Sequence, residues 1–253
     1  MIEQNAVLFD GATKRYGSLT ALDGLTLRVA PGTVFALVGP NGAGKTTAIG
    51  LLTGLLTPTA GHAAIFGVDV AKDPVNAKSR LGFVPDRPFL WPKWTPRESL
   101  RFVGAVFGMR GESLERRIDE ELQAFDLSEV ASSRNETLSH GTRQKVALAQ
   151  AFLHDPGLFV LDEPMVGLDP IAQRRLVARL RERAGRGAAV FFTTHQLALA
   201  EEFASESALL VKGRLAASGP PGDVKAADGT RGPLHQVFFA LTGASVREDG
   251  TLE

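Results

Sequence analysis

The sequence has no cysteine among its 253 residues, so disulfides, thiolate metal sites and cysteine nucleophiles are excluded. It also lacks an uninterrupted apolar run of about 18 residues, and therefore no membrane-spanning helix is expected. The first residues, MIEQNAVLFDGATKRYG, lack the basic start and apolar centre of a signal peptide. We expect a chain that is soluble by itself, in a reducing cytoplasm, and that meets a membrane only through a partner.

Net charge is also absent, because Lys plus Arg and Asp plus Glu both number 28. No global field favours nucleic acid, so we expect no nucleic-acid partner. The main local exception is a run of arginines, at Arg174, Arg175, Arg179, Arg181, Arg183 and Arg186. We interpret this run as the solvated face of a helix rather than as a nucleic-acid surface.

Short apolar segments alternate with segments of helical periodicity along most of the chain. The apolar segments, which read as strands buried on both faces, are residues 33–38 (TVFALV), 158–161 (LFVL) and 188–193 (AAVFFT). The helical segments are residues 46–56, 98–109, 114–125, 143–154 and 172–184. This alternation predicts an α/β fold with a parallel sheet.

Three regions depart from the alternation. Residues 6–13 and 25–30 read as strands with glycine turns between them, which predicts a small antiparallel β lobe over about residues 1–30. Residues 88–136 are helical without a strand signal, which predicts a helical insert lobe over about 88–155. A tail from about 215 to 253 contains an apolar short helix, 234–243, that ends in glycine. We interpret residues 1–253 as one domain with lobes.

A glycine-rich loop follows the first buried strand. It reads Gly39, Pro40, Asn41, Gly42, Ala43, Gly44, Lys45, Thr46, with Thr47 next, and it satisfies the P-loop pattern G-x-x-x-x-G-K-[ST]. Glycines let backbone N–H groups turn toward phosphate oxygens, and the following helix adds positive charge. Lys45 is expected to reach the β- and γ-phosphates, and Thr46 to help hold Mg²⁺. The alternative is a glycine-rich turn that precedes a helix by chance; Asn41 excludes a dinucleotide fingerprint.

A pair of carboxylates ends a later buried strand. Asp162 and Glu163 follow LFVL, at the sheet edge where ligands of open α/β folds bind. Asp162 is expected to bind Mg²⁺, and Glu163 to polarise the water that attacks the γ-phosphate. The alternative is a polar strand end that leads into a turn.

In motif order the chain resembles the nucleotide-binding domain of the ATP-binding-cassette (ABC) family, over nearly its whole length. Residues 138–144 (LSHGTRQ) resemble the LSGGQ signature, 165–169 (MVGLD) resemble the D-loop, and 192–195 (FTTH) resemble the switch-histidine segment. Tyr16 matches the aromatic residue that stacks on adenine. The resemblance implies a P-loop NTPase (RecA-like) core, a small antiparallel β lobe, a helical lobe, and ATP and Mg²⁺ as ligands.

The resemblance also implies a composite site. Ser139 reads as a helix N-cap and Gly141 as a point of close approach, so the two form a second anion-binding helix end. Family members use it in trans, which implies a homodimer or pseudo-symmetric dimer that sandwiches two ATP molecules. His195 is expected to contact the γ-phosphate and Asp169 to border the nucleotide. The alternatives are a well-capped helix, a structural histidine and, at Tyr16, an ordinary half-buried aromatic residue.

Three positions depart from the family pattern. Asp86 stands where the family usually has glutamine, and it can still accept a hydrogen bond from Mg²⁺-bound water. His140 replaces a signature glycine and Thr142 the usual glutamine. Because Ser139 and Gly141 are kept, we expect phosphate contact to be retained.

The output of the ATPase is suggested by residues 88–96 (PFLWPKWTP), which contain both tryptophans and are too irregular for a core element. An aromatic patch there is a candidate interface, with local lobe packing as the alternative. In the family this region receives a short cytoplasmic helix of an integral membrane permease, and the tail resembles that of subunits paired with export-type permeases. The resemblance therefore implies the ATP-driven motor of an exporter, peripheral on the inner face of the cell membrane. A soluble or regulatory ABC ATPase with a non-permease partner is the alternative.

Overall fold

The computed structural model describes residues 5–243. Its α-helices are α1 (Lys45–Leu52), α2 (Pro74–Lys78), α3 (Pro96–Val106), α4 (Gly111–Ala124), α5 (His140–Phe152), α6 (Pro170–Gly185), α7 (Leu197–Phe203) and α8 (Leu234–Thr242). Its strands are β1 (Val7–Tyr16), β2 (Leu19–Val29), β3 (Val34–Val38), β4 (Ala60–Ile65), β5 (Val68–Asp69), β6 (Leu81–Val84), β7 (Leu158–Asp162), β8 (Ala189–Thr194), β9 (Glu206–Val211), β10 (Arg214–Gly219), β11 (Val224–Ala226) and β12 (Arg231–Gly232). The expected α/β fold with a parallel sheet is confirmed.

The central sheet has eight strands in the order β12-β11-β10-β9-β3-β8-β7-β6. From β9 to β6 neighbouring strands are parallel, and from β9 to β12 they are antiparallel. Strands β3, β7 and β8 are buried along their whole length, as their continuous apolar sequences require. The parallel strands end at one edge, where β3 leads into the P-loop and β7 into the carboxylate pair.

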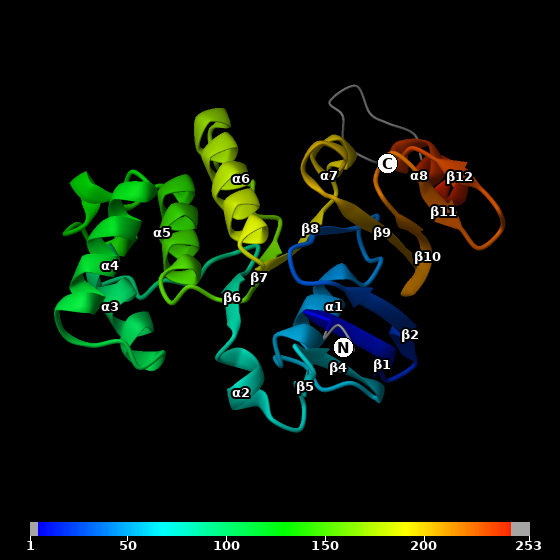
Figure 1. Ribbon diagram of the computed structural model, residues 1–253, viewed down its shortest axis with the longest axis horizontal. Coiled ribbons are helices and arrows are strands. Elements are labelled where there is room, and N and C mark those ends of the chain that lie inside the picture. The colour runs from blue at the N-terminus through cyan, green and yellow to red at the C-terminus, as the bar shows by residue number, and fades with distance from the viewer. Residues whose placement is uncertain (1–4, 244–253) are drawn as a thin grey trace.

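The two faces of the central sheet pack against different layers, because successive side chains of a strand point to opposite faces. Along β3, Phe35 and Leu37 pack toward α1 and the antiparallel sheet. Ala36 and Val38 pack instead with the cluster that contains α5, α6 and α8. Figure 1 shows the sheet between these layers.

The antiparallel sheet has four strands in the order β2-β1-β4-β5. β1 and β2 lie within the first 30 residues, but β4 and β5 come from residues beyond α1. The expected boundary near residue 30 therefore misses half of the strands in this sheet. The sequence of β4, AGHAAI, is composed mostly of small residues, so its strand pattern is weak.

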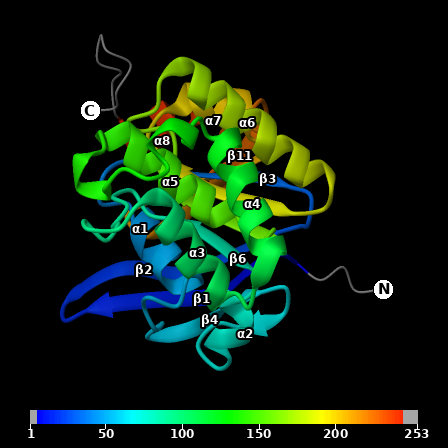
Figure 2. The ribbon, with the colours of Figure 1, turned by 90° about the vertical axis from the view of Figure 1, so that its left-hand side faces the viewer.

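Helices α3, α4 and α5 lie together at one end of the molecule, beside β6 and α6 (Figures 1 and 2). Residues 88–136 form helices, 3-10 turns and loops, as the sequence predicts. A capping box at Thr95 and Glu98, with Pro96 in the first turn, starts α3. At the other end of the chain, Gly243 caps α8 in the left-handed conformation, with φ of 64°.

The interpretation of the α6 arginine run as a solvated face holds only in part, because Arg174, Arg181 and Arg186 are exposed but the other three arginines face the helical lobe. Arg175, Arg179 and Arg183 are spaced four residues apart and all turn toward the helical lobe. They pair with Asp126, Glu121 and Asp155 respectively. The sequence shows these arginines, but their acidic partners lie 28 to 58 residues away in the chain, so the pairing is visible only in the structure.

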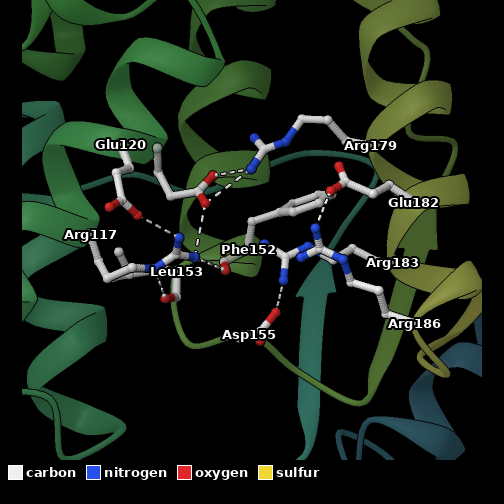
Figure 3. Close-up of polar contacts among 10 residues, drawn as sticks. Arg117, Glu120, Phe152, Leu153, Asp155, Arg179, Glu182, Arg183 and Arg186 are labelled. Atoms are coloured by element: carbon white, nitrogen blue, oxygen red, sulfur yellow. Dashed lines mark hydrogen bonds and ion pairs between the residues drawn. The ribbon is translucent and has the colours of Figure 1, made fainter.

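The middle pair of this series is the most buried. Glu121 is 1% exposed and binds Arg179 at 2.8 Å and Arg117 at 3.0 Å. The Arg179 guanidinium also lies over the rings of Phe125 and Phe152, at 4.6 and 4.5 Å from their centroids. Figure 3 shows Arg117 and Arg179 reaching into the same space from opposite helices. The lobe is thereby tied to α6 by charge and by packing.

Within residues 5–243, no helix is both long and apolar enough to cross a membrane.

Candidate functional site

The P-loop joins β3 to α1 and is shaped by close backbone packing. At Gly44, the N-cap of α1, φ is 107°, and an added Cβ would lie 2.5 Å from the carbonyl oxygen of Ala21. At Gly39, an added Cβ would lie 2.3 Å from the carbonyl oxygen of Leu210. Neither position can hold a larger residue without moving its neighbours. The glycines therefore fix the loop against β2 and β9 as well as leaving room for a ligand.

Lys45 begins α1 and folds back over the loop. Its ammonium donates hydrogen bonds to the carbonyl oxygens of Gly39 at 2.6 Å and Pro40 at 3.2 Å. Burial lowers the pKa of Lys45 from its usual value, while the nearby Glu163 and Asp162 carboxylates oppose that shift. The structure thus places Lys45 near the carboxylates of Asp162 and Glu163.

Asp162 is the last residue of β7 and is only 6% exposed. Its Oδ1 accepts a hydrogen bond of 2.5 Å from the hydroxyl of Thr193, its register partner on β8. Burial raises the pKa of Asp162, the Thr193 hydrogen bond opposes the rise, and the negative charge of Asp86 adds to it. A cation near Asp162 would favour its charged form.

Glu163 follows Asp162 with φ of 49°, in a backbone conformation that non-glycine residues seldom adopt. Its N–H donates to the Thr193 hydroxyl at 3.3 Å, and its Oε1 lies 2.8 Å from Nδ1 of His195. His195 follows β8 directly. Glu163 and His195, which follow the neighbouring parallel strands β7 and β8, are therefore in direct contact.

Thr193 is a site residue that the sequence reasoning missed. Its hydroxyl contacts both Asp162 and the backbone N–H of Glu163, so one buried group positions both carboxylates. A threonine at the end of an apolar strand is an ordinary sequence feature. Only the register between β7 and β8 shows which carboxylate it meets.

One cavity of about 620 Å³ unites most of the expected site residues. It is lined by Tyr16, Asn41, Gly42, Ala43, Gly44, Lys45, Thr46, Thr47, Asp86, Asp162, Glu163 and His195, together with Leu19, Ala21 and Val166. The last three were not expected. Tyr16 is 45% exposed and Leu19 64% exposed, and the two are register partners on β1 and β2, so they add exposed apolar surface to the cavity lining. The roles assigned to these residues remain predictions.

Five expected residues lie outside that cavity lining: Gly39 and Pro40 at the start of the P-loop, and Ser139, Gly141 and Asp169 at the starts of two helices. Ser139 caps α5 by accepting a hydrogen bond from the N–H of Thr142 at 3.1 Å. Asp169 caps α6, where its Oδ1 accepts from the N–H groups of Ile171 and Ala172. An added Cβ at Gly141 would lie 2.3 Å from the carbonyl oxygen of Gly167, so the signature and the D-loop are in close contact.

The residues present fit a magnesium ion held in part by nucleotide. Thr46, Asp162 and Asp86 line the cavity with hydroxyl and carboxylate oxygens, which are the donors that Mg²⁺ prefers. Residues 5–243 contain no cluster of three or more acidic, His or Cys side chains arranged to hold a metal alone. Few protein ligands, completed by phosphate and water, are typical of nucleotide-bound Mg²⁺.

A P-loop between a parallel strand and a helix, with a carboxylate pair at the end of a neighbouring strand, defines a P-loop nucleoside triphosphatase. A family model described as "ABC transporter" matches residues 22–166, which is more than half of the chain. The chain belongs to the ABC transporter family, as the sequence motifs indicate.

Curated relatives carry names from transport. The chain is 36% identical over 214 residues to the "Probable multidrug ABC transporter ATP-binding protein YbhF" of Escherichia coli, which covers 85% of this chain and 37% of that protein. It is 37% identical over 223 residues to the "Nod factor export ATP-binding protein I" of Paraburkholderia xenovorans, covering 88% and 73%. The chain thus spans little more than a third of the first relative and about three quarters of the second.

Solved structures agree with the fold. A structure described as the ATP-binding subunit of an ABC transporter superposes with a TM-score of 0.85 at 32% identity, over 94% of this chain and 99% of that chain. A dimeric ATP-binding cassette bound to ADP and phosphate superposes with a TM-score of 0.77 at 24% identity, over 85% and 98%. The predicted cassette fold is confirmed.

Proposed function

We propose that this chain is the ATP-hydrolysing motor subunit of an ABC exporter. Residues 1–253 would act as one cassette that binds ATP with Mg²⁺ and works with an integral membrane permease. The cassette would be peripheral on the inner face of the cell membrane and would touch the membrane through the permease. Relatives named for multidrug and Nod factor export support the export assignment.

The observation that carries the proposal is the meeting of the P-loop, Asp162, Glu163 and His195 around one cavity. Lys45 and the loop N–H groups would bind the phosphates, and Thr46 and Asp162 would hold Mg²⁺, which supplies charge neutralisation when bound. Glu163 would orient the attacking water, and His195, in contact with Glu163, would position the γ-phosphate. Tyr16 would stack on the adenine.

The placement of Ser139, Gly141 and Asp169 outside the cavity supports a dimer. In one subunit Ser139 and Asp169 cap helices, Gly141 lies in the first turn of α5, and none of the three lines the P-loop cavity. A second subunit placed head to tail would bring its own Ser139–Gly141 helix end to the γ-phosphate. The dimer would then enclose two ATP molecules, each bound by parts of both subunits.

An exposed aromatic surface supports the permease contact. Phe89, Trp91 and Phe102 are 74%, 54% and 52% exposed. Together with Trp94 they form a continuous series of ring contacts, with centroids 5.3 to 5.8 Å apart. We call these four residues the aromatic surface. Large exposed apolar areas of this kind mark contact sites for other proteins.

A groove is lined in part by Val103, the sequence neighbour of Phe102 in the aromatic surface. It has a volume of about 330 Å³ and lies between the core and the helical lobe. Its lining includes Leu55 and Phe83 from the core and Val103 and Phe107 from the lobe. An amphipathic helix of the permease would place its apolar side in this groove.

The proposal is tested by recovering the chain from detergent-solubilised membranes of cells that express its permease. We expect an integral membrane protein to co-purify, and Trp91→Ala with Trp94→Ala to reduce its recovery about tenfold or more. Nucleotide binding by the isolated variant should be unchanged, since neither tryptophan lines the nucleotide cavity. Val75→Ala, an 80% exposed residue on α2, is the matched control.

Two results would count against this role. Recovery of the chain without any integral membrane protein would favour a soluble or regulatory ATPase. Loss of ATP binding in the tryptophan variant would show that these side chains are part of the core. Because Trp94 is half-buried, the single Trp91→Ala variant is measured alongside.

A further inference from the structure

The nucleotide cavity contains a third carboxylate in addition to Asp162 and Glu163. Asp86 lies two residues beyond β6, and β6 is the parallel neighbour of β7 in the sheet. In the register of that pair, Val84 lies beside Leu161, so the chain after Val84 leaves the sheet next to Asp162 and Glu163. Adjacent strands are about 5 Å apart. All three carboxylates border the same cavity.

Little positive charge offsets this group. Among the residues that line the cavity, Lys45 and His195 are the only side chains able to carry a positive charge. Lys45 donates its hydrogen bonds to the loop carbonyl oxygens, and His195 contacts Glu163. Asp162 is held by the neutral hydroxyl of Thr193.

Within residues 5–243, the one ion pair of Asp86 at 4.0 Å or less is with Arg87. The Arg87 side chain is 93% exposed, so water and salt screen most of this interaction. Arg87 therefore offsets little of the negative charge of Asp86. Asp86 lines the space that a triphosphate would enter without a strong counter-charge of its own, whereas Asp162 has the Lys45 ammonium nearby.

We propose that the negative charge of Asp86 makes nucleotide binding depend more strongly on a divalent cation than it would with Asp162 and Glu163 alone. This inference rests on the proposed function, because it takes ATP as the ligand of the cavity. A triphosphate without metal carries a large negative charge and is repelled by each carboxylate in the cavity. When a divalent cation binds with the nucleotide, the contribution of Asp86 to the free energy of binding becomes favourable. The carboxylate then attracts the cation or accepts a hydrogen bond from its water.

Charge, rather than shape, is the property that matters in this account. A neutral amide at position 86 could still accept a hydrogen bond from metal-bound water. It would neither repel a free triphosphate nor attract the cation by a full charge. Asp86→Asn keeps the size of the side chain and removes only its charge, whereas Asp86→Glu keeps the charge and lengthens the side chain.

The test measures the dissociation constant of ATP by calorimetry, once in EDTA and once in saturating Mg²⁺. The quantity compared between variants is the dissociation constant in EDTA divided by the dissociation constant in Mg²⁺. We expect Asp86→Asn and Asp86→Gln to tighten binding in EDTA and to lower the ratio by about tenfold, the effect of one charge at short range in a partly solvated site. Asp86→Glu should keep the parent ratio.

A matched control removes one negative charge far from the cavity. Glu112→Gln changes an exposed residue in the first turn of α4 and should leave the ratio unchanged. Circular dichroism of each variant confirms that it is folded, and Asp86 is exposed enough to be replaced without disturbing the core.

Two results would overturn the inference. One is a ratio in Asp86→Asn that equals the ratio of the parent chain. The other is a ratio in Asp86→Glu that falls as far as it does in Asp86→Asn, which would show that geometry matters rather than charge. Failure of the proposed function is separate and recognisable. The unaltered chain would then bind no ATP even with Mg²⁺, and this inference would fall with it.

Discussion

Thr193 shows how one uncharged side chain can organise a charged site. It is fully buried, and its hydroxyl donates to Asp162 while accepting from the N–H of Glu163. Removing the hydroxyl would leave the Asp162 carboxylate without this hydrogen bond in a site where burial already disfavours its charge. Thr193 is thus a positioning residue for both carboxylates.

We predict that Thr193→Val lowers the rate of ATP hydrolysis about tenfold and the free energy of unfolding by about 1–3 kcal/mol. Valine keeps the shape of threonine, so the loss is that of the hydroxyl. ATP affinity in the presence of Mg²⁺ should change less than the single-turnover rate. Thr193→Ser should restore most of the rate. A Thr193→Val chain with an unchanged rate would show that Asp162 and Glu163 hold their positions without it.

At this scale, the sequence predicted the local parts of the site and missed the parts that depend on strand register. The P-loop and the Asp162–Glu163 pair are each formed by consecutive residues, so the sequence alone is enough to recognise them. Thr193 and Leu19 reach the site only because distant strands bring them there. Asp86 was expected, but the weak counter-charge around it is visible only in the structure.

Helix α6 is the element that links the site to the helical lobe. Asp169, the last residue of the D-loop segment, is its N-cap, and three of its arginines pair with the lobe. Lys145 on α5 lies 3.9 Å from both Asp126 and Asp169. The start of the signature helix, the D-loop and the lobe are therefore joined by contacts within one subunit.

We predict that Arg179→Ala destabilises the chain by about 2–4 kcal/mol, because it leaves the buried Glu121 with one partner and removes the packing on Phe125 and Phe152. Arg175→Ala is the matched control one turn away. Its pair with Asp126 is more than half exposed on both sides, so its loss should cost less than about 1 kcal/mol. Equilibrium unfolding in urea measures both.

Equal losses of stability in the two variants would show that burial does not set the strength of these pairs.

The prediction of elements from sequence succeeded where periodicity was strong, as in β3, α5 and α6. It failed for the role of three of the α6 arginines, because a sequence shows charges on a helix but not the helix that faces them. β4 was missed since small residues give a weak strand pattern.

At the scale of the whole molecule, we propose that a complete catalytic site needs two copies of the cassette. The cavity of one subunit holds the P-loop, the carboxylates and His195, while the Ser139–Gly141 helix end lies outside it. The overall architecture was predicted because the family motifs and their order fix it. The separation of the signature from the cavity was expected from the resemblance alone, and the dimer itself remains a proposal.

The most direct test uses Glu163→Gln, which keeps the shape of the site but activates water poorly. In the presence of ATP and Mg²⁺, we expect this variant to bind ATP, to hydrolyse it at least about a hundredfold more slowly than the parent, and to form a dimer. Light scattering after gel filtration measures the mass. Two controls should remain monomers: the Glu163→Gln variant without ATP, and the double variant Glu163→Gln with Lys45→Ala in the presence of ATP. A Glu163→Gln chain that binds ATP yet stays monomeric, or that hydrolyses ATP at the parent rate, would contradict the account.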